Sequence, residues 1–132
     1  MGLYPYHYEE LSVTKNFPLE PDHSMYVKLN DLGILHIVTC RDDGVLVGYI
    51  FAMVTPNLHY MSCKMACEDI YFLKKEYRRG RIGIDLFKFF EKEMVKLGVN
   101  RISVTTKVHL DNGVLFEYLG YSFIEKTFSK VI

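Results

Sequence analysis

The chain has 132 residues, and its 16 Lys and Arg residues balance its 16 Asp and Glu residues. This length fits a single domain, residues 1–132, because two independent cores would each be too small to be stable. The zero net charge gives no overall field towards nucleic acid or an anionic membrane. In addition, no apolar run approaches the roughly 20 residues that span a bilayer, and Met1–Glu10 lacks the pattern of a signal peptide.

The first half of the chain predicts a helix followed by a hairpin. In Glu20–Gly33, a proline near the start, apolar residues at helical spacing and a final glycine predict a helix. Gly33–Cys40 and Val45–Val54 are rich in β-branched and aromatic residues, and Arg41–Gly44 supplies the turn between these two strands.

The next segment, Cys63–Leu73, predicts a third strand. Its residues alternate, so we expect Cys67, Asp69, Tyr71 and Leu73 to share one face. The strand therefore carries an acidic residue and an aromatic residue towards the same side.

The second half of the chain has a different period. Ile82–Leu97 carries one apolar stripe with charged residues around it, and Gly98 stands where a left-handed helix cap is expected. Arg101–Val108 then predicts a strand, Asp111–Leu119 a short helix and Tyr121–Phe128 a final strand. This order predicts an α/β fold with a mixed sheet.

The loop KKEYRRGRIG connects the third strand to the amphipathic helix and is the candidate binding site. Unpaired N–H groups and the helix dipole favour an anion at a helix entry. Glycines let a phosphate approach the backbone, and flanking arginines add charged hydrogen bonds. These features predict a pyrophosphate-binding site. The alternative is that the loop is an ordinary basic turn exposed to solvent, without a ligand.

The order of residues in this loop resembles the acetyl-CoA motif of the GNAT superfamily, Arg/Gln-x-x-Gly-x-Gly/Ala. Arg78 matches the leading Arg and Gly83 the final Gly or Ala. The chain departs from the pattern at Arg81, which stands in place of the middle Gly, with Gly80 one residue earlier. The departure either alters one N–H contact to the pyrophosphate or brings the Arg81 side chain to the phosphate.

The resemblance extends from about Ile34 to Phe123. LFEYLGYSF is similar to the LYEKLGF segment of the family, and DDGVLVGYI is similar to its central hairpin. The match looks closest to small phage or bacterial members. It implies an α/β (α+β) fold with a mixed, mostly antiparallel sheet, flanking helices and a splayed strand pair that holds acetyl-CoA.

The resemblance also implies an activity: an N-acetyltransferase that moves an acetyl group to a primary amine by direct attack in a ternary complex. Val104–Lys107 would face the end of the third strand across the splay. The residues implied for cofactor binding are Tyr71, Phe72, Leu73, Arg78, Arg79, Gly80, Arg81, Ile82 and Gly83.

The candidates for the general base are Glu68 and Asp69, of which Asp69 is preferred because it shares the predicted face of Tyr71. The alternative to a catalytic role is a structural one, because acidic residues at a strand edge are usually solvated or paired with a nearby lysine. Where the family frequently has a tyrosine acid, this chain has Phe116. Three explanations stay open: the thiolate leaves without an acid, another group supplies the proton, or catalysis is impaired.

His59, Tyr60 and His109 are candidates for binding the acceptor, although a lone histidine is more often a surface residue. Cys63 and Cys67 have no histidine at zinc spacing, so no metal is expected, and an odd cysteine number favours a reducing cytoplasm.

The expected partners are acetyl-CoA and an unidentified amine, without nucleic acid or membrane; a homodimer is left open. The first alternative is a GNAT-fold protein that binds acyl-CoA without turnover, as a regulatory or host-interaction module. The second is nucleic-acid binding through KKEYRRGR, which the neutral charge disfavours.

Overall fold

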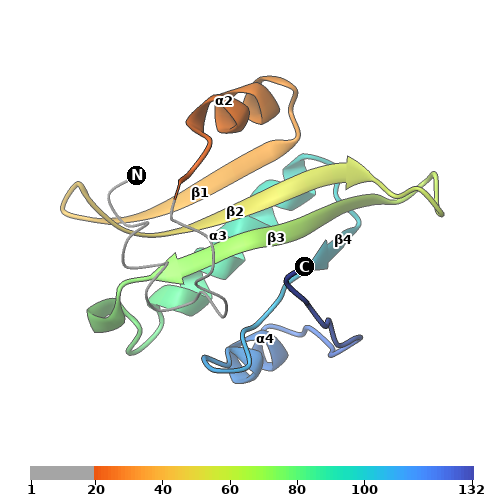
Figure 1. The fold of residues 1–132 in the computed structure, drawn as a ribbon. Coiled ribbons are helices and arrows are strands. Elements are labelled where there is room, and N and C mark those ends of the chain that lie inside the picture. Colours follow the sequence, from red (N-terminus) through yellow and green to blue (C-terminus); the bar gives the residue numbers. More distant parts are fainter. Residues whose placement is uncertain (1–19) are drawn as a thin grey trace.

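The structure, a computed structural model, describes residues 20–132. A four-stranded sheet in the order β1-β2-β3-β4 forms its centre (Figure 1). The first three strands are antiparallel, and β4 lies parallel to β3. The strands are β1 (Leu35–Asp42), β2 (Val45–Pro56), β3 (Lys64–Leu73) and β4 (Arg101–Ser103). The predicted fold class, a mixed and mostly antiparallel sheet flanked by helices, is confirmed.

Helices cover both faces of this sheet. The helical elements are α2 (His23–Asp31), the 3-10 helix η1 (Lys75–Tyr77), α3 (Ile82–Lys96) and α4 (Gly113–Tyr118). α3 lies behind the sheet in Figure 1 and follows directly after η1, at the end of β3. The loop from β3 to α3 is therefore held at one end of the sheet.

The helix α2 begins at an aspartate cap and ends at a glycine. The Asp22 side chain accepts a hydrogen bond from the Met25 N–H at 2.9 Å, which satisfies one of the free donors of the first turn. Gly33 has a φ of 72°, as expected for a residue that ends a helix. Of the predicted apolar face, Tyr26 and Leu29 pack against the sheet.

The β1–β2 hairpin is formed by the turn that the sequence predicts. Asp43 and Gly44 both have a positive φ, at 49° and 82°. Two successive residues of this kind fit the right-handed twist of a hairpin. The pairing then runs from Asp42 and Val45 to Leu35 and Met53, with one irregularity beside Cys40.

The main core lies between the sheet and α3. Leu86, Phe87, Phe90 and Met94 are the buried residues of α3, and they pack against strand residues including Ile50. The stripe predicted for this helix is thus confirmed, and the φ of 80° at Gly98 confirms its cap. A second cluster on the opposite face contains Leu35, Tyr49, Phe51 and Phe72.

A β-bulge interrupts β3 in its centre. Ala52 pairs with Glu68 and Phe51 pairs with Ile70, so Asp69 is the extra residue. A bulge of this type bends the strand and breaks its alternation. As a result, Tyr71 packs in the core on the α3 side, whereas Cys67 pairs with Met53, a residue of the opposite cluster. The predicted shared face of Cys67 and Tyr71 is wrong for this reason.

Two predicted strands differ from the structure. The strand expected at Arg101–Val108 ends at Ser103. The strand expected at Tyr121–Phe128 is absent, and residues 122–132 are exposed. At the end of α4, Gly120 has a φ of 93° and the Tyr121 N–H donates to the Phe116 carbonyl, and no described strand pairs with the segment that follows. This cap turns the chain away from the helix.

Candidate active site

The site lies where the two parallel strands separate. β3 and β4 pair only from Met65 and Arg101 to Cys67 and Ser103, and β3 then continues to Leu73. Past Cys67, the backbone of β3 has no strand partner on its β4 side in the described part of the chain. The predicted splay is present, but the facing segment, Val104–Lys107, is irregular rather than a strand.

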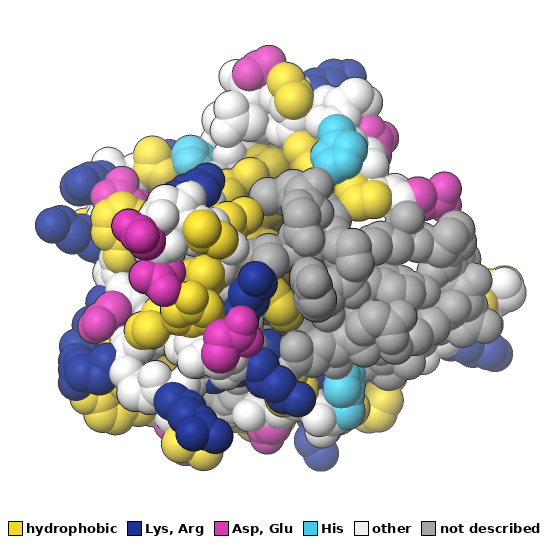
Figure 2. Space-filling model, turned by 90° about the vertical axis from the view of Figure 1, so that its left-hand side faces the viewer, with side chains coloured by type: hydrophobic (Ala, Val, Ile, Leu, Met, Phe, Trp, Pro, Cys, Tyr) yellow, Lys and Arg dark blue, Asp and Glu magenta, His cyan; other side chains and the backbone are white. Residues whose placement is uncertain are grey.

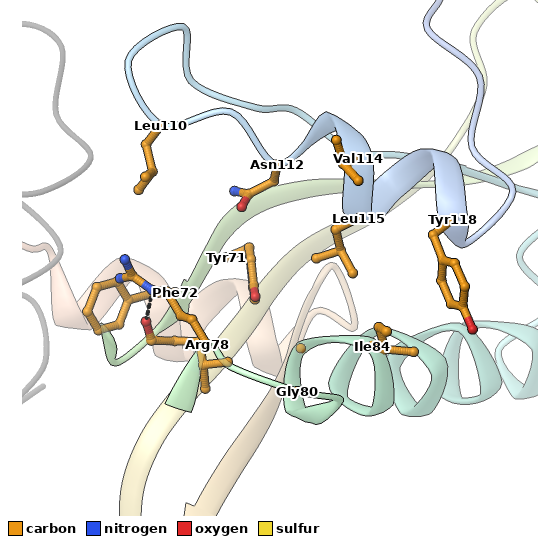
Figure 3. A pocket seen from close by; sticks show the side chains of 12 residues that line it. Tyr71, Phe72, Arg78, Gly80, Ile84, Leu110, Asn112, Val114, Leu115 and Tyr118 are labelled. Carbon is orange, nitrogen blue, oxygen red and sulfur yellow. Dashed lines mark hydrogen bonds between the residues drawn. The ribbon is translucent and has the colours of Figure 1, made fainter. Parts of the chain in front are cut away.

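A cavity of about 410 Å³ opens at this end of the sheet. Side chains from the end of β3, from the entry of α3 and from α4 face the same space (Figure 3). Its lining residues are Tyr71, Phe72, Leu73, Arg78, Gly80, Gly83, Ile84, Leu110, Asn112, Val114, Leu115 and Tyr118.

The entry of α3 supplies hydrogen-bond donors to this cavity. The first intrahelical bond runs from the Asp85 N–H to the Arg81 carbonyl at 2.9 Å. The N–H groups of Ile82, Gly83 and Ile84 therefore have no partner inside the helix. Together with the helix dipole, they form a site that suits an anion such as a pyrophosphate.

Arg78 ties the loop to the end of β3. Its Nε donates to the Leu73 carbonyl at 2.6 Å, and its guanidinium group lies 5.6 Å from the centre of the Phe72 ring. Both contacts fix the side chain on the cavity wall (Figure 3). The cavity thus has a positively charged group beside the helix entry.

Three of the residues expected to bind the cofactor, Arg79, Arg81 and Ile82, do not line the cavity. Arg81 lies 4.0 Å from Asp85, and both side chains are largely exposed. An exposed pair of this kind contributes little to stability, so the Arg81 side chain remains able to turn towards a bound phosphate.

Gly83 lies close to the Tyr71 side chain. A Cβ atom on Gly83 would lie 3.0 Å from the Tyr71 hydroxyl oxygen. The Tyr71 ring is itself held at 4.7 Å from the Phe87 ring. Burial raises the pKa of Tyr71, although Arg78 acts in the opposite direction. The hydroxyl is therefore protonated at neutral pH and can donate a hydrogen bond inside the cavity.

Phe116 is a core residue in this structure. It is buried and packs edge-on against Phe87 at 5.3 Å and against Tyr121 at 5.9 Å. Burial raises the pKa of Tyr121, whose hydroxyl has no hydrogen-bond partner among residues 20–132. Tyr121 does not line the cavity, so the hydroxyls that do so are those of Tyr71 and Tyr118.

The two acidic candidates occupy different environments. Glu68 is buried, and its Oε2 accepts hydrogen bonds from the Thr105 N–H at 3.0 Å and the Thr105 Oγ1 at 3.1 Å. Burial raises the pKa of Glu68, and the bonds from Thr105 oppose this effect. Asp69 is an exposed residue of the bulge, yet partial burial of its carboxyl raises its pKa, against the opposing charge of Lys107.

The residues expected to bind the acceptor are dispersed. His59 and Tyr60 lie in the loop between β2 and β3, where their N–H groups donate to the Asn57 side chain. Because β3 has ten residues, this loop is about 30 Å along the strand from the cavity at Leu73. His109 is exposed and follows β4, next to Leu110, which does line the cavity. None of the three is brought to the cavity, and their role stays a prediction.

The sequence predicts the short helix on the α4 side of the cavity, but not which of its residues line the cavity. The sequence does not predict Ile84, Leu110 and Asn112 as cavity residues, because apolar and amide side chains carry no chemical signature of their own. The cavity residues within α4 are Val114, Leu115 and Tyr118.

The described surface beside the site carries charges of both signs. Figure 2 shows Lys and Arg side chains interspersed with Asp and Glu on the part of this face that is described. No group of three His, Cys, Asp or Glu side chains within residues 20–132 is arranged to hold a metal ion. The described helices are also too short or too polar for a membrane span.

The sequence matches the Acetyltransferase (GNAT) family over residues 3–121. The chain therefore belongs to this family and is an N-acetyltransferase, a class of enzymes that uses acetyl-CoA. A comparison with curated protein sequences finds no match.

Solved structures share the fold at low sequence identity. Glucosamine-6-phosphate N-acetyltransferase from Arabidopsis thaliana has a TM-score of 0.76 and 16% identity, over 98% of this chain and 88% of that one. An aminoglycoside acetyltransferase from an uncultured soil metagenomic sample, in complex with sisomicin, has a TM-score of 0.73 and 17% identity, over 99% and 82%. A predicted acetyltransferase from Clostridium acetobutylicum, solved with acetyl-CoA, has a TM-score of 0.66 and 7% identity, over 86% and 79%.

Proposed function

We propose that this chain transfers the acetyl group of acetyl-CoA to a primary amine by direct attack in a ternary complex. The observation that carries the proposal is one cavity bounded by the unpaired edge of β3 and by the entry of α3. A free strand edge suits the amide groups of a pantetheine arm, and a helix entry suits the pyrophosphate.

The backbone at Gly80–Ile84 holds the pyrophosphate in this proposal. The N–H groups of Ile82, Gly83 and Ile84 donate to phosphate oxygens, and Arg78 adds charge from the wall of the cavity. Gly83 leaves room for the cofactor beside Tyr71. Arg81, in place of the motif glycine, contacts phosphate from the exposed side, with Arg79 beside it.

The edge of β3 at Tyr71–Leu73 holds the thioester. An N–H of this edge donates to the acetyl carbonyl and stabilises the oxyanion that forms on attack. The amine nitrogen bonds to the carbonyl carbon, the C–S bond breaks, and coenzyme A leaves as a thiolate. The products are an amide and the coenzyme A thiol, because the proton that the neutral amine loses balances the proton that the thiolate takes up.

Asp69 is the general base in this scheme. It is the more accessible of the two acidic residues beside the splay, and its raised pKa makes it a stronger base than an ordinary aspartate. In this scheme the Tyr71 hydroxyl, which belongs to a cavity residue and is protonated at neutral pH, gives the thiolate a proton and then recovers one from solvent. Phe116 has no hydroxyl for this step.

The experiment is an acceptor panel with acetyl-CoA, in which thiol release and the mass of each amine are measured. Amino sugars come first, because two structural neighbours are named for glucosamine-6-phosphate and aminoglycosides. Polyamines, amino acids, peptide N-termini and protein lysines follow. We expect thiol release that depends on one class of amine and a mass gain of one acetyl group on it.

A second candidate function, binding of acyl-CoA without turnover, is favoured by Phe116 and Arg81. It predicts that acetyl-CoA binds with no thiol release on any member of the panel. The two functions thus share the cavity and differ only in this measurement.

A further inference from the structure

We propose that Glu68 is a positioning residue that holds the splay between β3 and β4 open, and that it does so through its bonds to Thr105. The part of this inference that concerns acetyl-CoA rests on the proposed function. The part that concerns the strands does not.

The position of Glu68 is the first argument. The paired residues of the two strands end at Cys67 and Ser103, and Glu68 is the next residue of β3. Its carboxyl group is buried beside the first unpaired residues that follow β4. The side chain therefore lies at the vertex of the opening, where a continued ladder would bring the two backbones together.

The bonding of Thr105 is the second argument. A parallel ladder would pair backbone N–H groups with backbone carbonyls. Here the Thr105 N–H donates instead to Glu68 Oε2, and the Thr105 hydroxyl donates to the same oxygen. One carboxylate oxygen thus satisfies the backbone donor. The segment after β4 is therefore held away from the β3 backbone by the length of the Glu68 side chain.

The other end of the strand pair, at the start of β3 and β4, has no carboxylate between the two backbones. There the Asn100 N–H donates to the Lys64 carbonyl at 2.9 Å, and the Asn100 side chain accepts from the Lys64 N–H at 2.9 Å. The strands are closed at this end by backbone and amide bonds, and they are parted at the other end by the carboxylate.

A positioning role and a base role for Glu68 predict different behaviour. Both oxygen and nitrogen of a glutamine fit the same volume, and the amide oxygen still accepts from Thr105, but an amide cannot take a proton from an amine. Glu68→Gln therefore keeps the opening and removes the basicity. Glu68→Leu removes the acceptor and leaves the Thr105 N–H and hydroxyl, which lie at a part-buried contact, without this partner.

The first measurement is amide hydrogen exchange at Thr105 in the protein without ligand. We expect Glu68→Leu to lower the protection of this amide by about tenfold or more, as for loss of a bond to a charged acceptor, and Glu68→Gln to lower it by less than about threefold. Glu93→Gln, at a half-buried position of α3 where the carboxylate pairs with Lys96, is the matched control and should change nothing at Thr105. Unchanged protection in Glu68→Leu would overturn the proposal.

The second measurement separates binding from chemistry with acetyl-CoA and a responsive amine. Glu68→Leu should raise the Kd and the KM for acetyl-CoA by about tenfold, and Glu68→Gln should stay near the wild-type values in Kd, KM and kcat. A Gln variant that loses kcat with an unchanged KM would instead make Glu68 a base and overturn the positioning role.

Thr105 provides an independent test if Glu68→Leu does not fold. Thr105→Val removes the hydroxyl donor and keeps the N–H, whereas Thr105→Ser keeps both. We expect Val to raise the KM for acetyl-CoA about threefold to tenfold and Ser to restore it; equal KM values in both would contradict the proposal. If the wild type binds no acetyl-CoA, the proposed function fails, and the exchange at Thr105 still decides the structural part.

Discussion

At the scale of single residues, the two neighbouring carboxyl groups of β3 illustrate how position determines role. Glu68 is buried and bonded to Thr105, whereas Asp69 is the extra residue of a bulge and remains exposed. The Glu68 side chain thus bonds within the protein, whereas the Asp69 side chain is accessible to a substrate.

Asp69→Asn tests the base. We expect acetyl-CoA to bind as before, because Asp69 does not line the cavity, and we expect kcat/KM for the amine to fall by about 10² or more, which is typical of a lost general base. Because burial raises the pKa of Asp69 above its ordinary 3.8, the loss should be largest at pH values above the raised pKa and should shrink below it. Full activity in Asp69→Asn at neutral pH would contradict the assignment.

Glu68→Gln tests the electrostatics of the buried carboxyl. A pKa raised in the folded state means that the folded protein binds its proton more tightly than the unfolded chain, so this carboxyl costs stability as pH rises from 4.5 through the raised pKa. Glutamine does not ionise. The free energy of unfolding of Glu68→Gln minus that of the wild type should therefore grow across this window and then stay constant.

Urea denaturation at a series of pH values measures this difference. Asp69 and Lys107, the charged groups that act on Glu68, are present in both proteins, so their own titration largely cancels. A difference that shrinks with rising pH would mean that the bonds from Thr105 outweigh burial.

At the scale of elements, the end of β3 depends on close contact with β2. A Cβ atom on Gly48 would lie 2.7 Å from the Leu73 Cδ1 and 2.8 Å from the Phe72 carbonyl oxygen. Distances this short leave no room for a side chain, so glycine sets how closely β2 approaches the strand end that borders the cavity.

Gly48→Ala should therefore destabilise the protein by about 1–3 kcal/mol, as overpacking does, and should also weaken acetyl-CoA binding by displacing Leu73. Val45→Ala, at an exposed position of the same strand, is the control and should stay within about 0.5 kcal/mol of the wild type. Urea denaturation and calorimetric titration provide the two readouts. A Gly48→Ala protein as stable as the control would contradict the close packing.

The elements differ in how far the sequence predicts them. The apolar stripe of α3 and the Asp-Gly turn are local patterns, and both are confirmed. The bulge at Asp69 is not local, because it depends on the pairing of β3 with β2. The same holds for the end of β4 at Ser103, where Thr105 bonds a side chain from a distant strand.

In the site, too, local sequence patterns can be predicted, whereas contacts between distant parts of the chain cannot. The loop from Arg78 to Gly83 was identified because glycines and arginines before a helix carry a recognisable chemistry. Leu110, Asn112 and Leu115 complete the cavity from another part of the chain, and only the fold brings them there. The hydrogen bond between the buried Glu68 and Thr105 could not be predicted from the sequence for the same reason.

At the scale of the whole molecule, the chain combines a family fold with a modified cofactor site. The fold is shared with N-acetyltransferases at 16–17% identity, so the fold is the same while most side chains differ. Here the middle motif position holds Arg81 and the position of the usual acid holds the buried Phe116. In the proposed function, binding of acetyl-CoA depends mainly on backbone groups and Gly83, which these two differences leave in place.

Calorimetric titration of the intact protein with acetyl-CoA tests this account most directly. We expect one molecule to bind per chain, and Gly83→Leu to weaken binding by at least about tenfold, because its side chain would fill the space beside Tyr71. Val95→Leu, at an exposed position of the same helix, should bind like the wild type. Absence of binding to the wild type at millimolar acetyl-CoA, or undiminished binding to a folded Gly83→Leu protein, would contradict the proposed cofactor site.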